Sequence, residues 1–94
     1  MARLAMAPHA RLFEQIVQGR SNANIRFDQL CALLRALGFD ERIRGSHHLF
    51  QRAGVEEMIN LQRAAGKAKV YQVRQVRAIL MKYDWDERRA VEKP

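Results

Sequence analysis

A pair of histidines directly after a glycine-serine step is the clearest chemical signal in this sequence. His47 and His48 follow Gly45-Ser46 and are two of only three histidines in the 94 residues. Histidine is the side chain whose ordinary pKa lies nearest to neutral pH, so it can accept or donate a proton in catalysis. An exposed histidine can take the proton of a ribose 2′-hydroxyl or give one to a leaving oxygen. The pair therefore points first to RNA chemistry.

The two histidines cannot both face a substrate, because neighbouring side chains on a strand point to opposite faces. If Phe50 packs in the core, His48 shares its side. His47 then lies on the open face, beside Leu49 and Gln51. If Leu49 is the core residue instead, the two histidines exchange places. The bulk of Phe50 favours the first arrangement.

Positive charge is the second signal. The chain has 17 Lys and Arg against 10 Asp and Glu, a net charge of +7. Such an excess favours a polyanion: nucleic acid, an acidic protein or an anionic membrane surface. Together with the positive end of a helix dipole, one basic cluster predicts a phosphate-binding corner. This cluster consists of Lys67, Lys69, Arg74 and Arg77. A second basic group, expected on the sheet and its turns, consists of Arg42, Arg44, Arg52 and Arg63.

Hydrophobic periodicity predicts the elements that position these residues. Helices are predicted over residues 8–18, 26–37 and 71–83. Strands are predicted over residues 39–44, 47–52 and 55–62, with turns at 45–46 and 53–54. Residues 1–7 are expected to be frayed, and residues 63–69 to form a basic, alanine-rich loop. The prediction is an α+β domain of two layers, in which the second and third helices cover one face of an antiparallel sheet.

Composition limits the class of protein. A chain of 94 residues is one small domain, which buries roughly 60–65% of its unfolded surface. Cys31 is the only cysteine; we expect a small core residue in a reducing cytosol and no disulfide framework. No run is long enough to span a membrane, and the N-terminus lacks the apolar segment of a signal peptide. The histidines have no partners at metal-ligand spacing, so neither a metal nor another cofactor is expected.

The motif Gly45-Ser46-His47, with residues 33–39 before it and Phe50 and a basic helix after it, resembles the HicA family of bacterial toxins. The resemblance covers about residues 25–85 and includes the segment 66–77. It implies a double-stranded-RNA-binding-like α-β-β-β-α fold and a messenger-RNA interferase that needs no metal. It also implies a cytoplasmic, bacterial protein with an antitoxin partner, HicB, that covers the active face.

The resemblance, which names the histidine, and the placement of charge and glycine, which names the RNA contacts, together assign roles to particular residues. His47 would be the catalytic histidine, with His48 as second choice. Gly45 and Ser46 would let the RNA backbone approach closely. The side chains expected to hold that backbone are Lys67, Lys69, Arg74 and Arg77.

The chain departs from the family pattern at Val70, where a proline is often found, and in an added N-terminal helix and loop. We divide it into an extension at 1–24, the HicA-like domain at 25–85 and a charged tail at 86–94. The extension could widen the core, bind a partner or mark a branch with altered activity. Two rival functions share the basic surface: a non-catalytic RNA-binding module, and a degenerate toxin or subunit that acts through protein interaction.

Overall fold

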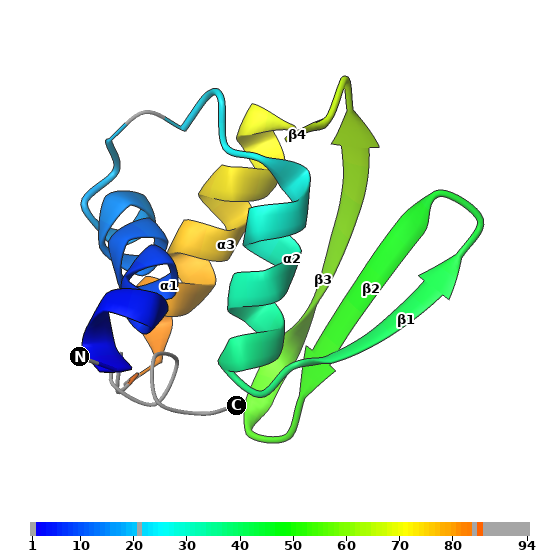
Figure 1. The fold of residues 1–94 in the computed structure, drawn as a ribbon. Coiled ribbons are helices and arrows are strands. Elements are labelled where there is room, and N and C mark those ends of the chain that lie inside the picture. The colour runs from blue at the N-terminus through cyan, green and yellow to red at the C-terminus, as the bar shows by residue number, and fades with distance from the viewer. Residues whose placement is uncertain (1, 21, 84, 86–94) are drawn as a thin grey trace.

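The computed structural model describes residues 2–20, 22–83 and 85. Within them the chain forms an α+β fold, as predicted, in which helices cover an antiparallel sheet (Figure 1). The helices are α1 (Ala2–Val17), α2 (Phe27–Ala36) and α3 (Val70–Lys82). The strands are β1 (Asp40–Arg44), β2 (His47–Arg52), β3 (Val55–Ala64) and β4 (Lys67–Ala68), and they lie in the order β1-β2-β3-β4.

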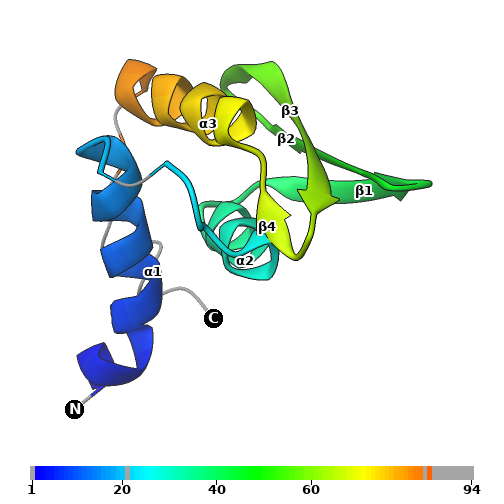
Figure 2. The same ribbon diagram turned by 90° about the horizontal axis from the view of Figure 1, so that it is seen from above.

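The core lies between the sheet and the helices. Helices α2 and α3 cover one face of the sheet, and α1 packs on their far side (Figure 2). From the covered face of the sheet, Phe50, Ile59 and Leu61 are fully buried. Ile16 of α1 is also fully buried and belongs to the same apolar cluster. The N-terminal helix therefore widens the core.

The β1–β2 hairpin is built as the sequence predicts. Gly45 has a φ of +59°, which suits the first position of a two-residue hairpin turn. Strand β2 has the predicted bounds, and Phe50 is fully buried. Because side chains alternate along the strand, His48 shares the covered face with Phe50 and His47 lies on the open face. Of the two arrangements that the sequence allows, the one with Phe50 in the core and His47 exposed is therefore the one that forms.

The helix ends match the prediction closely, with one exception. Helices α2 and α3 each begin and end within one residue of the predicted bounds. Gly38 follows α2 with a φ of +94°, the left-handed geometry that commonly ends a helix. Helix α1 begins at Ala2, so the prediction of a frayed segment over residues 1–7 was wrong from residue 2. The residues before Pro8 are mostly alanine, leucine and methionine, whose high helix propensity outweighs the hydrogen bond lost at proline.

The segment 63–69 is not a loop. Strand β3 continues to Ala64, and β4 pairs with it antiparallel, with Arg63 opposite Ala68. The turn between them has positive φ at both central residues, +53° at Ala65 and +79° at Gly66. Alanine is uncommon in that geometry, so the sequence carries no clear turn signal there. The backbone N–H of Ala68 also donates to the carbonyl of Ile25 at 2.9 Å, which ties β4 to the segment before α2.

The last described residue packs back on the core. The Trp85 ring stacks on Phe39 with ring centroids 5.7 Å apart, and the Arg52 guanidinium lies 4.8 Å from the Trp85 ring centroid. The charged tail predicted for residues 86–94 lies outside the described residues. None of the helices in the described part of the chain is long and apolar enough to cross a membrane.

A charged junction joins the end of α3 to β3. The Glu57 carboxylate accepts hydrogen bonds from Lys82 Nζ at 2.9 Å and from the Tyr83 hydroxyl at 2.7 Å. The bonds from Lys82 and then Tyr83 lower the pKa of Glu57 from 4.5 to about 2. A carboxyl whose pKa is lower in the folded state stabilises that state above its unfolded pKa. This stabilisation is therefore present above pH 4.5 and is lost as the pH falls towards 2.

We expect the melting temperature of Glu57→Gln to fall less between pH 5 and about pH 2 than that of the unmodified protein, because the variant has no carboxyl to protonate there. Differential scanning calorimetry across this range measures the slope. Glu56→Gln is the matched control, because the Glu56 side chain is 89% exposed and lies 3.9 Å from Lys82. Equal slopes for Glu57→Gln and Glu56→Gln would contradict a stabilising role for the junction.

Candidate nucleic-acid interface

His47 is held in place on the open face of the sheet by a residue from the neighbouring strand. The imidazole is exposed, and its Nδ1 lies 3.1 Å from Asn60 Oδ1 on β3. An amide carbonyl oxygen can only accept a hydrogen bond, so Nδ1 is the donor. The lone pair of the neutral ring is then on Nε2. His47 is therefore oriented as a base at Nε2.

A glutamine beside His47 connects the hairpin turn to a lysine. Gln62 on β3 pairs with His47 in the strand register. Its amide nitrogen donates to Ser46 Oγ at 2.9 Å, and its amide oxygen accepts from Lys69 Nζ at 3.4 Å. Lys69 is also the N-cap residue directly before α3, so the positive end of the helix dipole lies beside it. Ser46, His47 and Lys69 thus come together through one side chain.

The open face carries further positive charge around an apolar patch. Arg44 lies opposite His47 and Arg42 lies opposite Leu49 in the pairing of β1 with β2, and both arginines are exposed. Met58 of β3 is 45% exposed. A shallow depression on this side of the molecule is lined by Asp40, Glu41, Arg42, Arg44, Leu49, Gln51 and Met58.

The four basic residues predicted to form one phosphate-binding corner do not share one set of partners. Lys69 is beside Gln62, whereas Lys67 Nζ donates to Asn24 Oδ1 at 2.6 Å, on the segment before α2. Arg77 is half-buried, and its Nε donates to the backbone carbonyl of Val17 at 3.2 Å. Arg77 thus binds the C-terminal end of α1, so its expected place in an exposed phosphate-binding corner was wrong.

Arg74 is exposed, and it lines a second depression together with Gln18, Gly19, Asn22 and Arg77. The second basic group is divided as well. Arg42 and Arg44 lie on the open face, whereas Arg63 pairs with Asp28 at 2.7 Å beside α2. Of the two predicted basic groups, Lys69, Arg42 and Arg44 are therefore the members that add positive charge near His47.

His48 has partners of its own on the covered face. Its Nδ1 lies 2.8 Å from Glu41 Oε2, and its ring meets the Phe27 ring edge to face at a centroid distance of 4.8 Å. Glu41 Oε1 accepts a further bond from Arg35. Burial raises the pKa of Glu41, but the bonds from His48 and Arg35 outweigh burial and lower it. Burial raises the pKa of the neighbouring Cys31 thiol to about 11.

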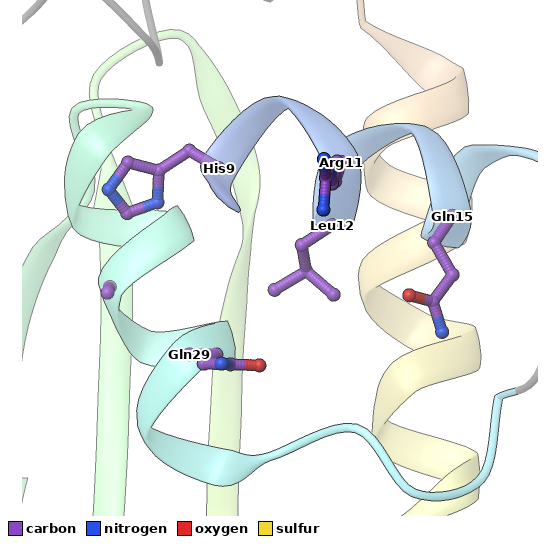
Figure 3. Close-up of a pocket in the computed structure, with 6 residues that line it drawn as sticks. His9, Arg11, Leu12, Gln15 and Gln29 are labelled. Atoms are coloured by element: carbon purple, nitrogen blue, oxygen red, sulfur yellow. The ribbon is translucent and has the colours of Figure 1, made fainter. Parts of the chain in front are cut away.

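A pocket between α1 and α2 lies away from the open face (Figure 3). His9 and Gln15 of α1 and Gln29 of α2 line it, with Leu12 at its apolar side. Because α2 separates it from the sheet, this pocket is not part of the surface around His47.

The sequence analysis missed Asn60 and Gln62. Side chains alternate along the strand predicted at residues 55–62, so Asn60 and Gln62 lie on the face opposite to the one on which Ile59 and Leu61 face the core. The sequence could therefore have placed both residues on the open face. Their partners depend on the pairing register of β2 with β3, which the sequence does not show.

No family model, curated protein or solved structure matches this chain. The case for function therefore depends on the geometry around His47.

Proposed function

We propose that this protein is an endoribonuclease that cleaves messenger RNA, the toxin of a toxin–antitoxin module, acting in the bacterial cytoplasm. The observation that supports this most is the setting of His47. Its ring is exposed on the open face, its Nδ1 is held by Asn60, and Gln62 places Lys69 nearby. An oriented base next to a cation can take the proton of the 2′-hydroxyl of RNA while the cation balances the charge of the adjacent phosphate.

In the proposed reaction, His47 Nε2 takes the proton of a ribose 2′-hydroxyl. The 2′-oxygen attacks the adjacent phosphorus, and the bond from phosphorus to the 5′-oxygen breaks. The leaving 5′-oxygen takes a proton from the imidazolium, which restores the neutral ring. The products are a 2′,3′-cyclic phosphate and a 5′-hydroxyl. The nucleophile belongs to the substrate, so this route uses no metal-bound water.

Lys69 would balance the charge that builds up on the phosphate oxygens. Its ammonium group is close to the Ser46 turn through Gln62. The turn itself lets the RNA backbone approach, because no atom lies within 4 Å of where a Cβ of Gly45 would be. Arg42 and Arg44 would bind neighbouring phosphates along the same face.

This assignment predicts different effects for two lysines in the same segment. Lys69→Gln is expected to lower the slope of log affinity against log salt by about 0.7, the value of one contact on single-stranded RNA. Lys67→Gln is expected to leave the slope nearly unchanged, because Lys67 is bound to Asn24 away from His47. Fluorescence anisotropy of labelled single-stranded RNA at several KCl concentrations measures both slopes, with His47→Ala present in each protein to prevent cleavage. A larger change for Lys67→Gln would place the RNA elsewhere.

One observation favours a second function, an RNA-binding module without catalysis. Among the described residues, His47 is alone of its kind on the open face: His9 lies on α1 and His48 faces the helices. No second histidine on the described part of this face is therefore available to act as a general acid and protonate the leaving 5′-oxygen. In this alternative the basic face would bind RNA and leave it intact.

The same face would also bind the antitoxin, a HicB-like protein. Exposed Met58 and half-buried Leu49 give it an apolar centre, and Arg42 and Arg44 give it positive charge. A partner with an apolar and acidic surface would match it and would exclude RNA from His47.

Induction of the full chain in a bacterial host tests the proposed function. We expect growth arrest and loss of messenger RNA over time, both absent with His47→Ala. Arrest without loss of messenger RNA would favour the binding module, and normal growth with intact messenger RNA would refute the toxin proposal. Purified protein incubated with RNA in the presence of a chelator tests the metal-independent step, which should proceed unchanged.

A further inference from the structure

Three side chains that are far apart in the sequence meet beneath the β1–β2 hairpin. Cys31 comes from α2, Glu41 from β1 and His48 from β2. Taking one ligand atom from each, the thiol sulfur, a carboxylate oxygen and a ring nitrogen all lie within 4.8 Å of one another. Glu41 Oε2 and His48 Nδ1 lie 2.8 Å apart.

Thiolate sulfur, imidazole nitrogen and carboxylate oxygen are each donors that zinc binds in proteins. Bond lengths of about 2.0–2.3 Å in a tetrahedral site place ligand atoms roughly 3.3–3.8 Å apart. An ion between His48 and Glu41 would increase the distance from the ring nitrogen to the carboxylate oxygen by about half an ångström or somewhat more. The sulfur, which lies at most 4.8 Å from the other two ligand atoms, would need to move by up to about 1.2 Å, which side-chain rotation can supply. The backbone can therefore stay in place.

The carboxylate is already oriented for this purpose. Arg35 donates to Glu41 Oε1, which leaves Oε2 directed at His48. A hydrogen bond to the second atom of a ligating group is the usual way in which proteins fix a metal ligand. The positive charge of Arg35 opposes a cation, but the carboxylate and a thiolate together supply two negative charges.

Access favours an ion over a larger ligand. Cys31 is only 3% exposed, whereas the His48 and Glu41 side chains are 21% and 16% exposed. An ion can enter past the histidine and the carboxylate. A substrate could not reach the buried thiol. Cys31 is therefore not an accessible nucleophile of the kind that cysteine enzymes use.

We propose that Cys31, Glu41 and His48 form a binding site for a zinc-type divalent cation, with water as the fourth ligand. Binding releases the thiol proton to solvent and forms the bond from sulfur to metal. The hydrogen that His48 Nδ1 now shares with Glu41 is exchanged through solvent for one on Nε2, so that the Nδ1 lone pair can bond the metal. The ion joins α2 to both strands of the hairpin, so it stabilises the fold from the covered face and takes no part in proton transfer at His47. The proposal does not depend on the ribonuclease assignment.

Titration of the full, reduced, metal-free chain with Co²⁺ tests the site. We expect one Co²⁺ per chain, with the absorption band of thiolate-to-cobalt charge transfer, and displacement of the band by Zn²⁺. Cys31→Ser should abolish the band. His48→Gln and Glu41→Gln should each weaken binding by at least about tenfold, since even outer-shell partners contribute that much. Zn²⁺ should raise the melting temperature of the unmodified protein and not that of His48→Gln.

His47→Gln is the matched control, because it removes the adjacent histidine on the opposite face and should keep full metal affinity. If Cys31→Ser does not fold, His48→Gln decides the question, because its side chain is partly exposed. Absence of the charge-transfer band, or a band of unchanged affinity in His48→Gln, would overturn the proposal. If His47→Gln loses Co²⁺ binding and the other variants keep it, the ion binds adventitiously on the open face and the proposal is wrong.

Discussion

Replacing His47 with alanine is expected to reduce RNA cleavage by about 10²–10⁴-fold, the usual contribution of a positioned general acid or base. The variant should fold and bind RNA as before. His47 is exposed, and its ring is hydrogen-bonded to the exposed Asn60. Single-turnover cleavage of a labelled RNA gives the rate, and anisotropy with the same RNA gives the affinity.

Two control variants make this result specific. Gln51→Ala removes another exposed side chain from the same face of β2 and should leave cleavage unchanged. His48→Gln tests the second histidine, and it should lower stability more than the cleavage rate because His48 faces Glu41 and Phe27. Cleavage by His47→Ala at the unmodified rate would exclude His47 as the base. Lost cleavage in His48→Gln with full stability would move the role to His48.

Replacing Ile16 with alanine is expected to lower the free energy of unfolding by about 2–5 kcal/mol. Ile16 lies on α1, is fully buried and belongs to the same apolar cluster as the sheet residues. The substitution removes three carbon atoms from a closely packed interior and leaves a cavity between α1 and the other helices. A small domain has a total stability of about 5–15 kcal/mol, so this loss is a large fraction of it.

Urea denaturation followed by circular dichroism measures the change. Glu14→Ala, an exposed position on the same helix, should change stability by less than about 0.5 kcal/mol. If Ile16→Ala has the same midpoint of urea denaturation as the unmodified protein, α1 does not contribute to the stability of the core. The expected loss would instead show that residues 25–85 depend on the N-terminal helix for their stability.

The sequence by itself determined most of the local elements and, along β2 and β3, which side chains share a face. Gly45-Ser46 marks the hairpin turn, and the alternation around Phe50 gives β2 its bounds and places His47 on the open face. These features could be predicted because they depend on residues within a few positions of one another. The turn at Ala65 and Gly66 was missed because alanine rarely adopts a positive φ.

The partners of the two histidines were decided only by the tertiary structure. Asn60 meets His47 through the pairing register of β2 with β3, and Glu41 meets His48 through that of β1 with β2. Cys31 joins the second group because α2 packs across the hairpin. Register and helix packing are set by the whole core at once, and one step in register would exchange the faces of a strand. Spacing along the chain therefore predicted that His47 is exposed, but not what holds it.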